Sequence, residues 1–193
     1  MRNMNISRPA VGRSLKEGIT MKHNQLIILT RTAVLAALIA IATMVIPIPI
    51  PGGGYANAGD IVILITAFVL GPVPAAFAAG FGSVVADLLL GYSAYAPGTL
   101  LVKGLAGLTA GLVFLALERR SGSFLSMLTA GIAGEAVMVA GYYVFEALIL
   151  QSALAAAAGV VPNILQGTAG IAGALVLMPA LRKALRFRSA AKK

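Results

Sequence analysis

The chain of 193 residues contains no cysteine, no tryptophan and a single histidine, His23, near its N-terminus. Without cysteine it cannot form disulfides, thiolate metal sites or a cysteine nucleophile. A single histidine at the chain end also excludes a histidine-based catalytic triad and a multi-histidine metal site. We therefore expect neither a catalytic residue nor a metal site, and we predict that the protein is not an enzyme.

Charged residues are also scarce. They make up 11% of the chain, and hydrophobic residues make up 59%, whereas a soluble domain has roughly 25% charged residues. Residues 61–86 and 147–181 contain no charged side chain at all. Both stretches are longer than the ~20 apolar residues that cross a bilayer. The lack of charge therefore predicts a protein that crosses a membrane several times.

The net charge of +9 comes mostly from basic residues gathered in three places. These are Arg2, Arg8, Arg13, Lys16, Lys22 and Arg31 at the start, Arg119 and Arg120 in the middle, and Arg182, Lys183, Arg186, Arg188, Lys192 and Lys193 at the end. Basic residues mark the cytoplasmic side of membrane spans, and such clusters suit anionic lipid headgroups. We expect the lipid bilayer as a partner and no nucleic acid.

Six apolar spans can be drawn, over about 26–46, 60–70, 74–90, 97–117, 124–150 and 162–181. An even number of spans puts both termini on one side, so that all the basic clusters fall inside. The loops 47–59, 91–97 and 151–161 then fall outside and carry no Lys or Arg. The sequence thus predicts an all-α membrane protein, a compact bundle of six transmembrane helices with both termini cytoplasmic.

We expect three segments: a disordered basic tail over 1–22, a substrate-binding bundle over 23–185 and a basic cytoplasmic tail over 186–193. The chain has no Gly-rich loop followed by Lys-Ser/Thr, which is the sequence that binds ATP phosphates. No cofactor is therefore expected in this chain.

Ionisable residues inside the spans are the main functional candidates, because each costs several kcal/mol in a bilayer unless it is paired or hydrated. They are Asp60, Asp87, Lys103, Glu135 and Glu146. All except Glu135 are expected in the outer third of the bundle, as are Asn163 and Gln166. This arrangement predicts a pocket open to the outside. Asp60 either caps its helix or contacts a ligand, and Glu135 has no assigned role.

The strongest candidate ligand set is Glu146, Asn163 and Gln166, with hydrogen bonding between helices as the alternative. Tyr142 joins them, because residues 135, 139, 142 and 146 share one helical face. Lys103 either contacts the ligand or is a paired structural base. Asp87 cannot cap a helix at its C-terminal end. We expect it to pair with Lys103 and to position that side chain without contacting the ligand itself.

Two further segments have candidate roles. In the loop 47–59, Gly53, Gly54 and Tyr55 suit a movable lid, and Asn57 is a candidate ligand contact; a passive connector is the alternative. In the first span, small residues at 33, 36, 37 and 40 let a second helix approach closely. Either they pack inside the bundle, or Ala33 and Ala37 dock a partner subunit.

The sequence resembles the substrate-binding S components of energy-coupling factor (ECF) vitamin transporters. The resemblance is carried by Ala-Asp-Leu-Leu-Leu-Gly-Tyr at 86–92, Ala-Pro-Gly-Thr-Leu-Leu-Val-Lys-Gly-Leu-Ala-Gly at 96–107 and Pro-Asn-Ile-Leu-Gln-Gly at 162–167. It covers about residues 26–185 and is nearest to the riboflavin, hydroxymethylpyrimidine and pyridoxine branch. The chain lacks the Trp of thiamin binders and the N-terminal His ligands of cobalt or nickel relatives.

This resemblance implies six helices and a place in a prokaryotic cytoplasmic membrane. It implies capture of a water-soluble vitamin or vitamin precursor from outside, under the first external loop. It also implies partners: a transmembrane coupling subunit that docks on Ala33 and Ala37, and two ATPases that use ATP on separate chains.

Two other classes of function are open to the sequence. A self-sufficient secondary transporter of a small polar metabolite should place polar groups near the membrane midplane, where we expect only Glu135. An intramembrane enzyme would have to rely on Glu, Asp and Lys chemistry, which nothing in the sequence requires.

Overall fold

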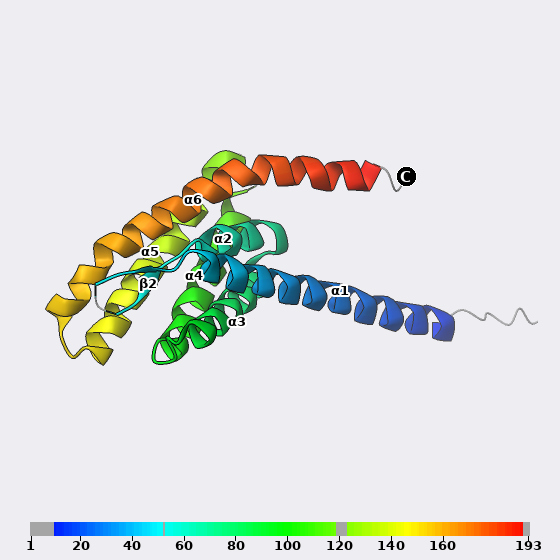
Figure 1. Cartoon of the computed structure of the whole chain (residues 1–193). Helices are drawn as coiled ribbons and strands as arrows, with labels where there is room; N and C mark the ends of the chain where they lie inside the picture. Colours follow the sequence, from blue (N-terminus) through cyan, green and yellow to red (C-terminus); the bar gives the residue numbers. More distant parts are fainter. Residues whose placement is uncertain (1–9, 52, 119–122, 191–193) are drawn as a thin grey trace, which may run out of the picture.

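The computed structural model describes residues 10–51, 53–118 and 123–190 (Figure 1). Its helices are α1 (Ala10–Val45), α2 (Gly59–Leu70), α3 (Pro72–Leu90), α4 (Ala96–Leu117), α5 (Ser123–Ile149) and α6 (Ala153–Ala190). Between α1 and α2, strands β1 (Ile48–Pro49) and β2 (Tyr55–Ala56) form a small antiparallel hairpin. We call the segment 47–58 the hairpin segment.

Five of the described helices contain a stretch long and apolar enough to cross a membrane, over 23–45, 72–90, 96–117, 123–149 and 153–184. Helix α2 has only 12 residues, or roughly 18 Å at 1.5 Å per residue. The hydrocarbon core is about 30 Å thick. The expectation of six transmembrane helices is therefore met only in part: the structure has six helices, and five of them are long enough to cross a membrane. Gly71, with φ of +85°, and Pro72 end α2 after Leu70, because proline breaks a helix interior.

Two other boundaries differ from expectation. Helix α1 begins at Ala10, so residues 10–22 are helical where a disordered tail was expected. Helix α6 begins at Ala153, which shortens the expected 151–161 loop to a brief turn. Alanines from 155 to 158 favour helix, and Ser152 Oγ accepts a 3.1 Å hydrogen bond from the Ala155 N–H as an N-cap. The basic residues 2, 8, 119, 120, 192 and 193 lie outside the described residues.

Helix α2 lies in the middle of the bundle and contacts α1, α3, α4 and α6. Around it, α1 packs on α3, α3 on α4, α4 on α5 and α5 on α6. Small residues allow these close contacts: a Cβ on Gly107 of α4 would lie 2.9 Å from the carbonyl oxygen of Ala75 on α3. Such close approach is typical of helix association in lipid.

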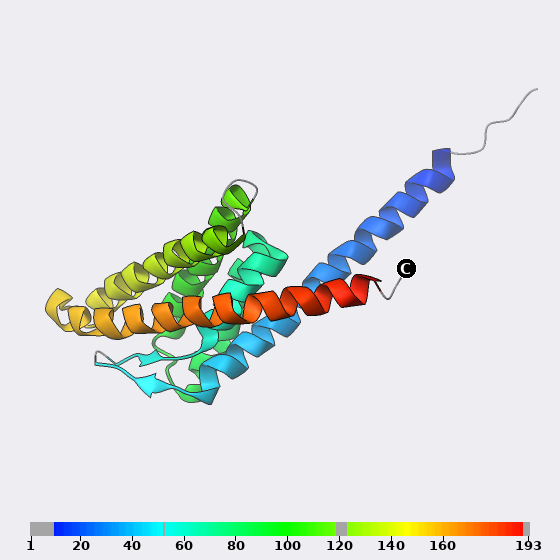
Figure 2. The same ribbon diagram turned by 90° about the horizontal axis from the view of Figure 1, so that it is seen from above.

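The two ends of the bundle differ in polarity. One end is filled by an apolar cluster that includes Leu64, Phe68, Phe114, Met127 and Met178, with the Phe68 and Phe114 rings 4.9 Å apart between centroids. The hairpin segment and the α5–α6 turn lie at the other end, away from both ends of the chain (Figures 1 and 2). Most of the buried polar side chains of the described residues lie toward the hairpin end.

Candidate functional site

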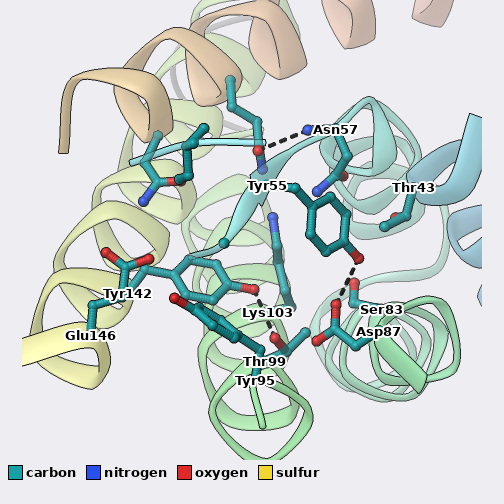
Figure 3. Close-up of a pocket in the computed structure, with 14 residues that line it drawn as sticks. Thr43, Tyr55, Asn57, Ser83, Asp87, Tyr95, Thr99, Lys103, Tyr142 and Glu146 are labelled. Atoms are coloured by element: carbon teal, nitrogen blue, oxygen red, sulfur yellow. Dashed lines mark hydrogen bonds between the residues drawn. The ribbon is translucent and has the colours of Figure 1, made fainter. Parts of the chain in front are cut away.

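A polar cavity lies beneath the hairpin segment, with walls from α1, α3, α4, α5 and α6 (Figure 3). It is lined by Thr43, Ile50, Gly54, Tyr55, Asn57, Ser83, Asp87, Tyr95, Thr99, Lys103, Tyr142, Glu146, Asn163 and Gln166. The cavity is therefore built from segments far apart in the chain, and it exists only in the folded bundle.

Lys103 is held by a buried ion pair with Asp60. Its Nζ lies 2.6 Å from Asp60 Oδ1, and both side chains are buried. The other Asp60 oxygen accepts a hydrogen bond from Gln166 Nε2. The expected Asp87–Lys103 pair is therefore wrong, because α2 begins deep in the bundle and brings Asp60 to the level of Lys103. Asp60 makes no side-chain cap hydrogen bond.

Asp87 lines the cavity and holds the hairpin segment. Its Oδ1 accepts a 2.6 Å hydrogen bond from the Tyr55 hydroxyl (Figure 3), and the Tyr55 ring lies 4.6 Å from the Tyr92 ring between centroids. Burial, followed by the hydrogen bond and the negative charge of Asp87, raises the pKa of Tyr55 well above its ordinary value. Tyr55 therefore stays a neutral donor to Asp87.

A second contact fixes the hairpin segment to α6. The Asn57 backbone N–H donates a 3.0 Å hydrogen bond to Gln166 Oε1. The Asn57 side-chain oxygen accepts a 2.9 Å bond from the Gly59 N–H, so this side chain stabilises its own turn. Gln166 thus connects the Asp60–Lys103 pair to the backbone of the hairpin segment.

Glu146 forms the opposite wall, with 1% of its surface exposed. Its carboxylate lies against two glycines: a Cβ on Gly159 would be 2.5 Å from Oε2, and a Cβ on Gly54 would be 3.4 Å from Oε1. Burial, and then the negative charge of Glu146 and the neighbouring Tyr92, raise the pKa of Tyr95 to about 12. The Tyr142 hydroxyl donates to Thr99 Oγ1 at 3.1 Å.

The cavity brings together nine of the residues singled out in the sequence: Lys103, Tyr142, Glu146, Asn163, Gln166, Asn57, Gly54, Tyr55 and Asp87. Gly53 lies in the hairpin turn outside the lining. Glu135 and Val139 line a different groove between α5 and α6, where the Glu135 side chain lies against Gly167.

Sequence reasoning missed Thr43, Ile50, Ser83 and Tyr95 as lining residues. Ser83 could have been found, because it lies one helical turn before Asp87 on the same face of α3. Tyr95 is not marked by helical spacing, because it precedes α4; only 9% of its surface is exposed, and its ring packs edge-on against Phe145.

The free space inside the cavity is about 20 Å³. That volume holds roughly one water molecule, whereas ligand pockets commonly enclose about 300–1,000 Å³. Any larger ligand therefore requires the walls to move. The hairpin segment is the wall of the cavity that is not part of a helix.

A second feature lies on the outer surface of α1. Ala33 and Ala37 are exposed and line an apolar groove of about 730 Å³ between α1 and α3. All four alanines line this groove, and Ala36 and Ala40 lie on its inner wall: Ala40 is buried, and a Cβ on Gly82 of α3 would lie 2.5 Å from the Ala36 carbonyl oxygen. The pair 36/40 therefore lies where α1 packs on α3, and the pair 33/37 is the more exposed part of the groove. Within the described residues, no group of three or more His, Cys, Asp or Glu side chains is placed to hold a metal ion.

A multi-pass helical bundle with a buried polar cavity at one end defines a membrane protein that binds a small molecule. The model of the family described as "ECF-type riboflavin transporter, S component" matches residues 24–183, and the chain belongs to this family. It is accordingly a membrane-embedded transporter subunit that captures a vitamin for an ECF transporter, and not an enzyme.

Two further proteins are similar to this chain. A Pyrococcus woesei protein described as "Uncharacterized protein in gap 3'region" is 36% identical over 134 residues, which is 69% of this chain and 86% of that protein. A solved structure described as "Structure and mechanism of the S component of a bacterial ECF transporter" aligns with a TM-score of 0.64 and 22% identity. The alignment covers 83% of this chain and 98% of the solved chain. It shows that the two proteins share a fold.

Proposed function

We propose that this chain captures a water-soluble vitamin or vitamin precursor in the cavity beneath the hairpin segment and delivers it to an ATP-driven ECF complex. The observation that carries this proposal is the cavity itself, a cluster of buried polar side chains in an otherwise apolar bundle. Lys103, Tyr142, Glu146, Asn163, Gln166 and the backbone around Asn57 are the proposed ligand contacts. Asp60 holds Lys103 by an ion pair and Gln166 by a hydrogen bond.

The hairpin segment is the proposed lid. Two hydrogen bonds hold it to the bundle, from Tyr55 to Asp87 and from Asn57 to Gln166. The bond to the charged Asp87 contributes about 1.5–3 kcal/mol net and the bond to Gln166 about 1 kcal/mol, so that opening costs a few kcal/mol. Gly53, with φ of +102°, and Gly54 form the turn of this lid.

The proposed topology has both termini in the cytoplasm. In this arrangement α2 and the hairpin segment together make the second of six crossings, since α2 alone is too short. The three basic clusters then face the cytoplasm, and the hairpin segment and the α5–α6 turn face outside.

The groove at Ala33 and Ala37 is the proposed docking surface for the transmembrane coupling subunit. Small side chains there allow a partner helix to approach closely. Two ATPases on separate chains would supply the energy, because this sequence lacks an ATP-binding loop.

Mass spectrometry of small molecules released from the detergent-purified protein tests the proposal directly. We expect a vitamin or vitamin precursor at about one molecule per chain. Titration calorimetry with the released compound and with riboflavin, the vitamin named in the family description, should then give tight binding. A protein that releases no such compound and binds no water-soluble vitamin would refute the proposed function.

A further inference from the structure

A groove on the face of α5 and α6 lies outside the polar cavity. It encloses about 580 Å³, a volume within the roughly 300–1,000 Å³ of common ligand pockets. Most of its walls are apolar, with Ile132 and Val139 from α5 and Ile164 and Ile171 from α6. Ile132 and Ile164 are about half exposed. Because both helices are long and apolar enough to cross a membrane, the groove opens to lipid.

Glu135 is the one ionisable carboxyl group among the described residues that line this groove. It lies near the middle of the 27 residues of α5, roughly 20 Å from either end of the helix at 1.5 Å per residue. The carboxyl group is therefore close to the centre of the bilayer. An ionisable group at that depth is costly, and where one occurs it commonly has a function.

The two carboxyl oxygens of Glu135 lie beside two glycines of α6. A Cβ on Gly170 would be 3.5 Å from Oε1 of Glu135 and 2.9 Å from the Cβ of Asp60. Oε1 is thus on the side of the Asp60–Lys103 pair. A Cβ on Gly167 would be 3.1 Å from Oε2, and Gly167 lines the groove. Oε2 is therefore the oxygen on the groove side.

This second oxygen lacks a partner. Oε2 is buried and has no hydrogen bond to a described residue, and only 6% of Glu135 is exposed. Asp60 and Lys103 are the charged groups that face it, and the Lys103 Nζ forms its ion pair with Asp60. The Thr168 hydroxyl in the groove donates to the Ile164 carbonyl oxygen at 2.8 Å. Buried polar atoms are almost always hydrogen-bonded in native proteins, so Oε2 indicates a partner from outside the chain.

We infer that this groove binds a lipid-soluble alcohol, whose hydroxyl group bonds to Glu135 Oε2 and whose apolar body lies along α5 and α6. A hydroxyl group both donates and accepts, so it satisfies Oε2 whether the carboxyl group is charged or protonated. A phospholipid cannot provide this partner, because its head group lies about 15 Å away, outside the hydrocarbon core. This site is separate from the polar cavity and goes beyond the proposed function.

A photoreactive alcohol tests the inference on the full-length protein in phosphatidylcholine vesicles. The probe is an octanol that carries a diazirine ring, and its matched control is the methyl ether of the same molecule, which cannot donate a hydrogen bond. Mass spectrometry of peptides locates the label, and groove residues other than Glu135 are scored relative to other lipid-facing residues. We expect the alcohol to label the groove at least about fivefold more than the ether does, as the loss of one hydrogen bond predicts.

Substitutions at Glu135 then assign this preference to the carboxyl group. Glu135→Leu removes the group, and we expect the alcohol and the ether to label this variant equally. Glu135→Gln keeps a side-chain carbonyl oxygen that accepts a hydrogen bond, and should retain the preference within about twofold. Thermal melting shows whether each variant is folded.

A second pair of variants tests the shape of the groove. Ala140→Leu adds bulk to an exposed lining residue without altering the carboxyl group, and should lower labelling by both probes. Val144→Leu is the matched control, because Val144 is exposed on α5 outside the groove, and should leave labelling unchanged.

Three results would overturn the inference. They are equal labelling of the unmodified protein by the alcohol and the ether, a folded Glu135→Leu variant that keeps the preference, and a groove that neither probe labels. The comparison of alcohol and ether needs no substitution, so it decides the matter even if Glu135→Leu does not fold.

Discussion

The Tyr55 hydroxyl donates a 2.6 Å hydrogen bond to Asp87 Oδ1, and thereby fixes the hairpin segment to a helix 32 residues further along the chain. Asp87 remains directed into the cavity through its second oxygen. One carboxyl group therefore touches both the proposed lid and the proposed binding space. A ligand that bonds to Asp87 acts on the residue that also holds the lid closed.

Tyr55→Phe removes this contact and keeps the ring. Because a hydrogen bond to a charged carboxylate contributes about 1.5–3 kcal/mol net, we expect the open lid to become roughly tenfold to a hundredfold more populated and ligand association to be faster by up to the same factor. Stopped-flow measurement of the association rate checks this expectation. Tyr143→Phe is the control, because Tyr143 lines the outer α5–α6 groove. An unchanged rate in Tyr55→Phe would show that this bond does not limit opening.

The Asp60–Lys103 pair should be the main polar contribution to stability. Asp60→Asn or Lys103→Met leaves a buried charge without its partner, which costs about 3–5 kcal/mol. We expect a clear fall in thermal stability for either single variant, and a smaller fall for the double variant Asp60→Asn, Lys103→Met, in which no charge is left unpaired. Thermal melting in detergent measures all three. Additive losses in the double variant would argue against the pair.

Bulky residues at the α1 groove should block transport without affecting capture. We expect Ala33→Leu or Ala37→Leu to abolish vitamin uptake by cells, because the partner helix can no longer approach closely. Affinity in the isolated protein should stay within about twofold, because the groove lies outside the polar cavity. Leu38→Phe is the control, since Leu38 is exposed on α1 outside this groove. Full uptake by the alanine variants would refute the docking role.

Much of this arrangement could be predicted from helical spacing. Two pairs of buried residues each share one helix face, as their spacing of about one turn predicts. They are Thr99 with Lys103 on α4, and Asn163 with Gln166 on α6. The helix order and the polar end of the bundle were also predictable, because apolar runs and turn residues are local features of the sequence.

The partner of Lys103 could not be predicted, because it depends on how deep α2 begins. The sequence shows where the prolines end the first helix, but the hairpin segment decides how far the chain enters the bundle before Asp60. Asp87 is closer to Lys103 in sequence and has no capping role, so the chain alone favours it as the partner. The position of Tyr95 depends likewise on packing against Phe145, which sequence spacing does not reveal.

Cysteine labelling tests the orientation cleanly, because the chain has no cysteine of its own. Ser152→Cys lies in the α5–α6 turn and should react with an impermeant maleimide in intact cells. Ala184→Cys is exposed near the other end of α6 and should react only after lysis. The reverse labelling pattern would show that the topology is inverted and that the cavity faces the cytoplasm.

The final prediction concerns the wall behind Glu146. Gly159→Ala adds a Cβ that would lie 2.5 Å from Glu146 Oε2, so the carboxyl group must move although its chemistry is unchanged. Displacing one buried ligand contact costs about 1–3 kcal/mol, which corresponds to roughly a tenfold to hundredfold loss of affinity. We expect Asn163→Ala and Glu146→Gln each to lower the affinity by a similar factor.

Titration calorimetry with the released ligand measures these losses. Gly104→Ala is the matched control, because its added Cβ would meet only the Ala76 carbonyl oxygen at 3.5 Å, an ordinary contact. We expect this control to bind as the unmodified protein does. Unchanged affinity in Gly159→Ala, Glu146→Gln and Asn163→Ala together would move the ligand away from the α5–α6 wall, since two of these changes act on the Glu146 carboxyl group and the third removes the Asn163 side chain from the same wall.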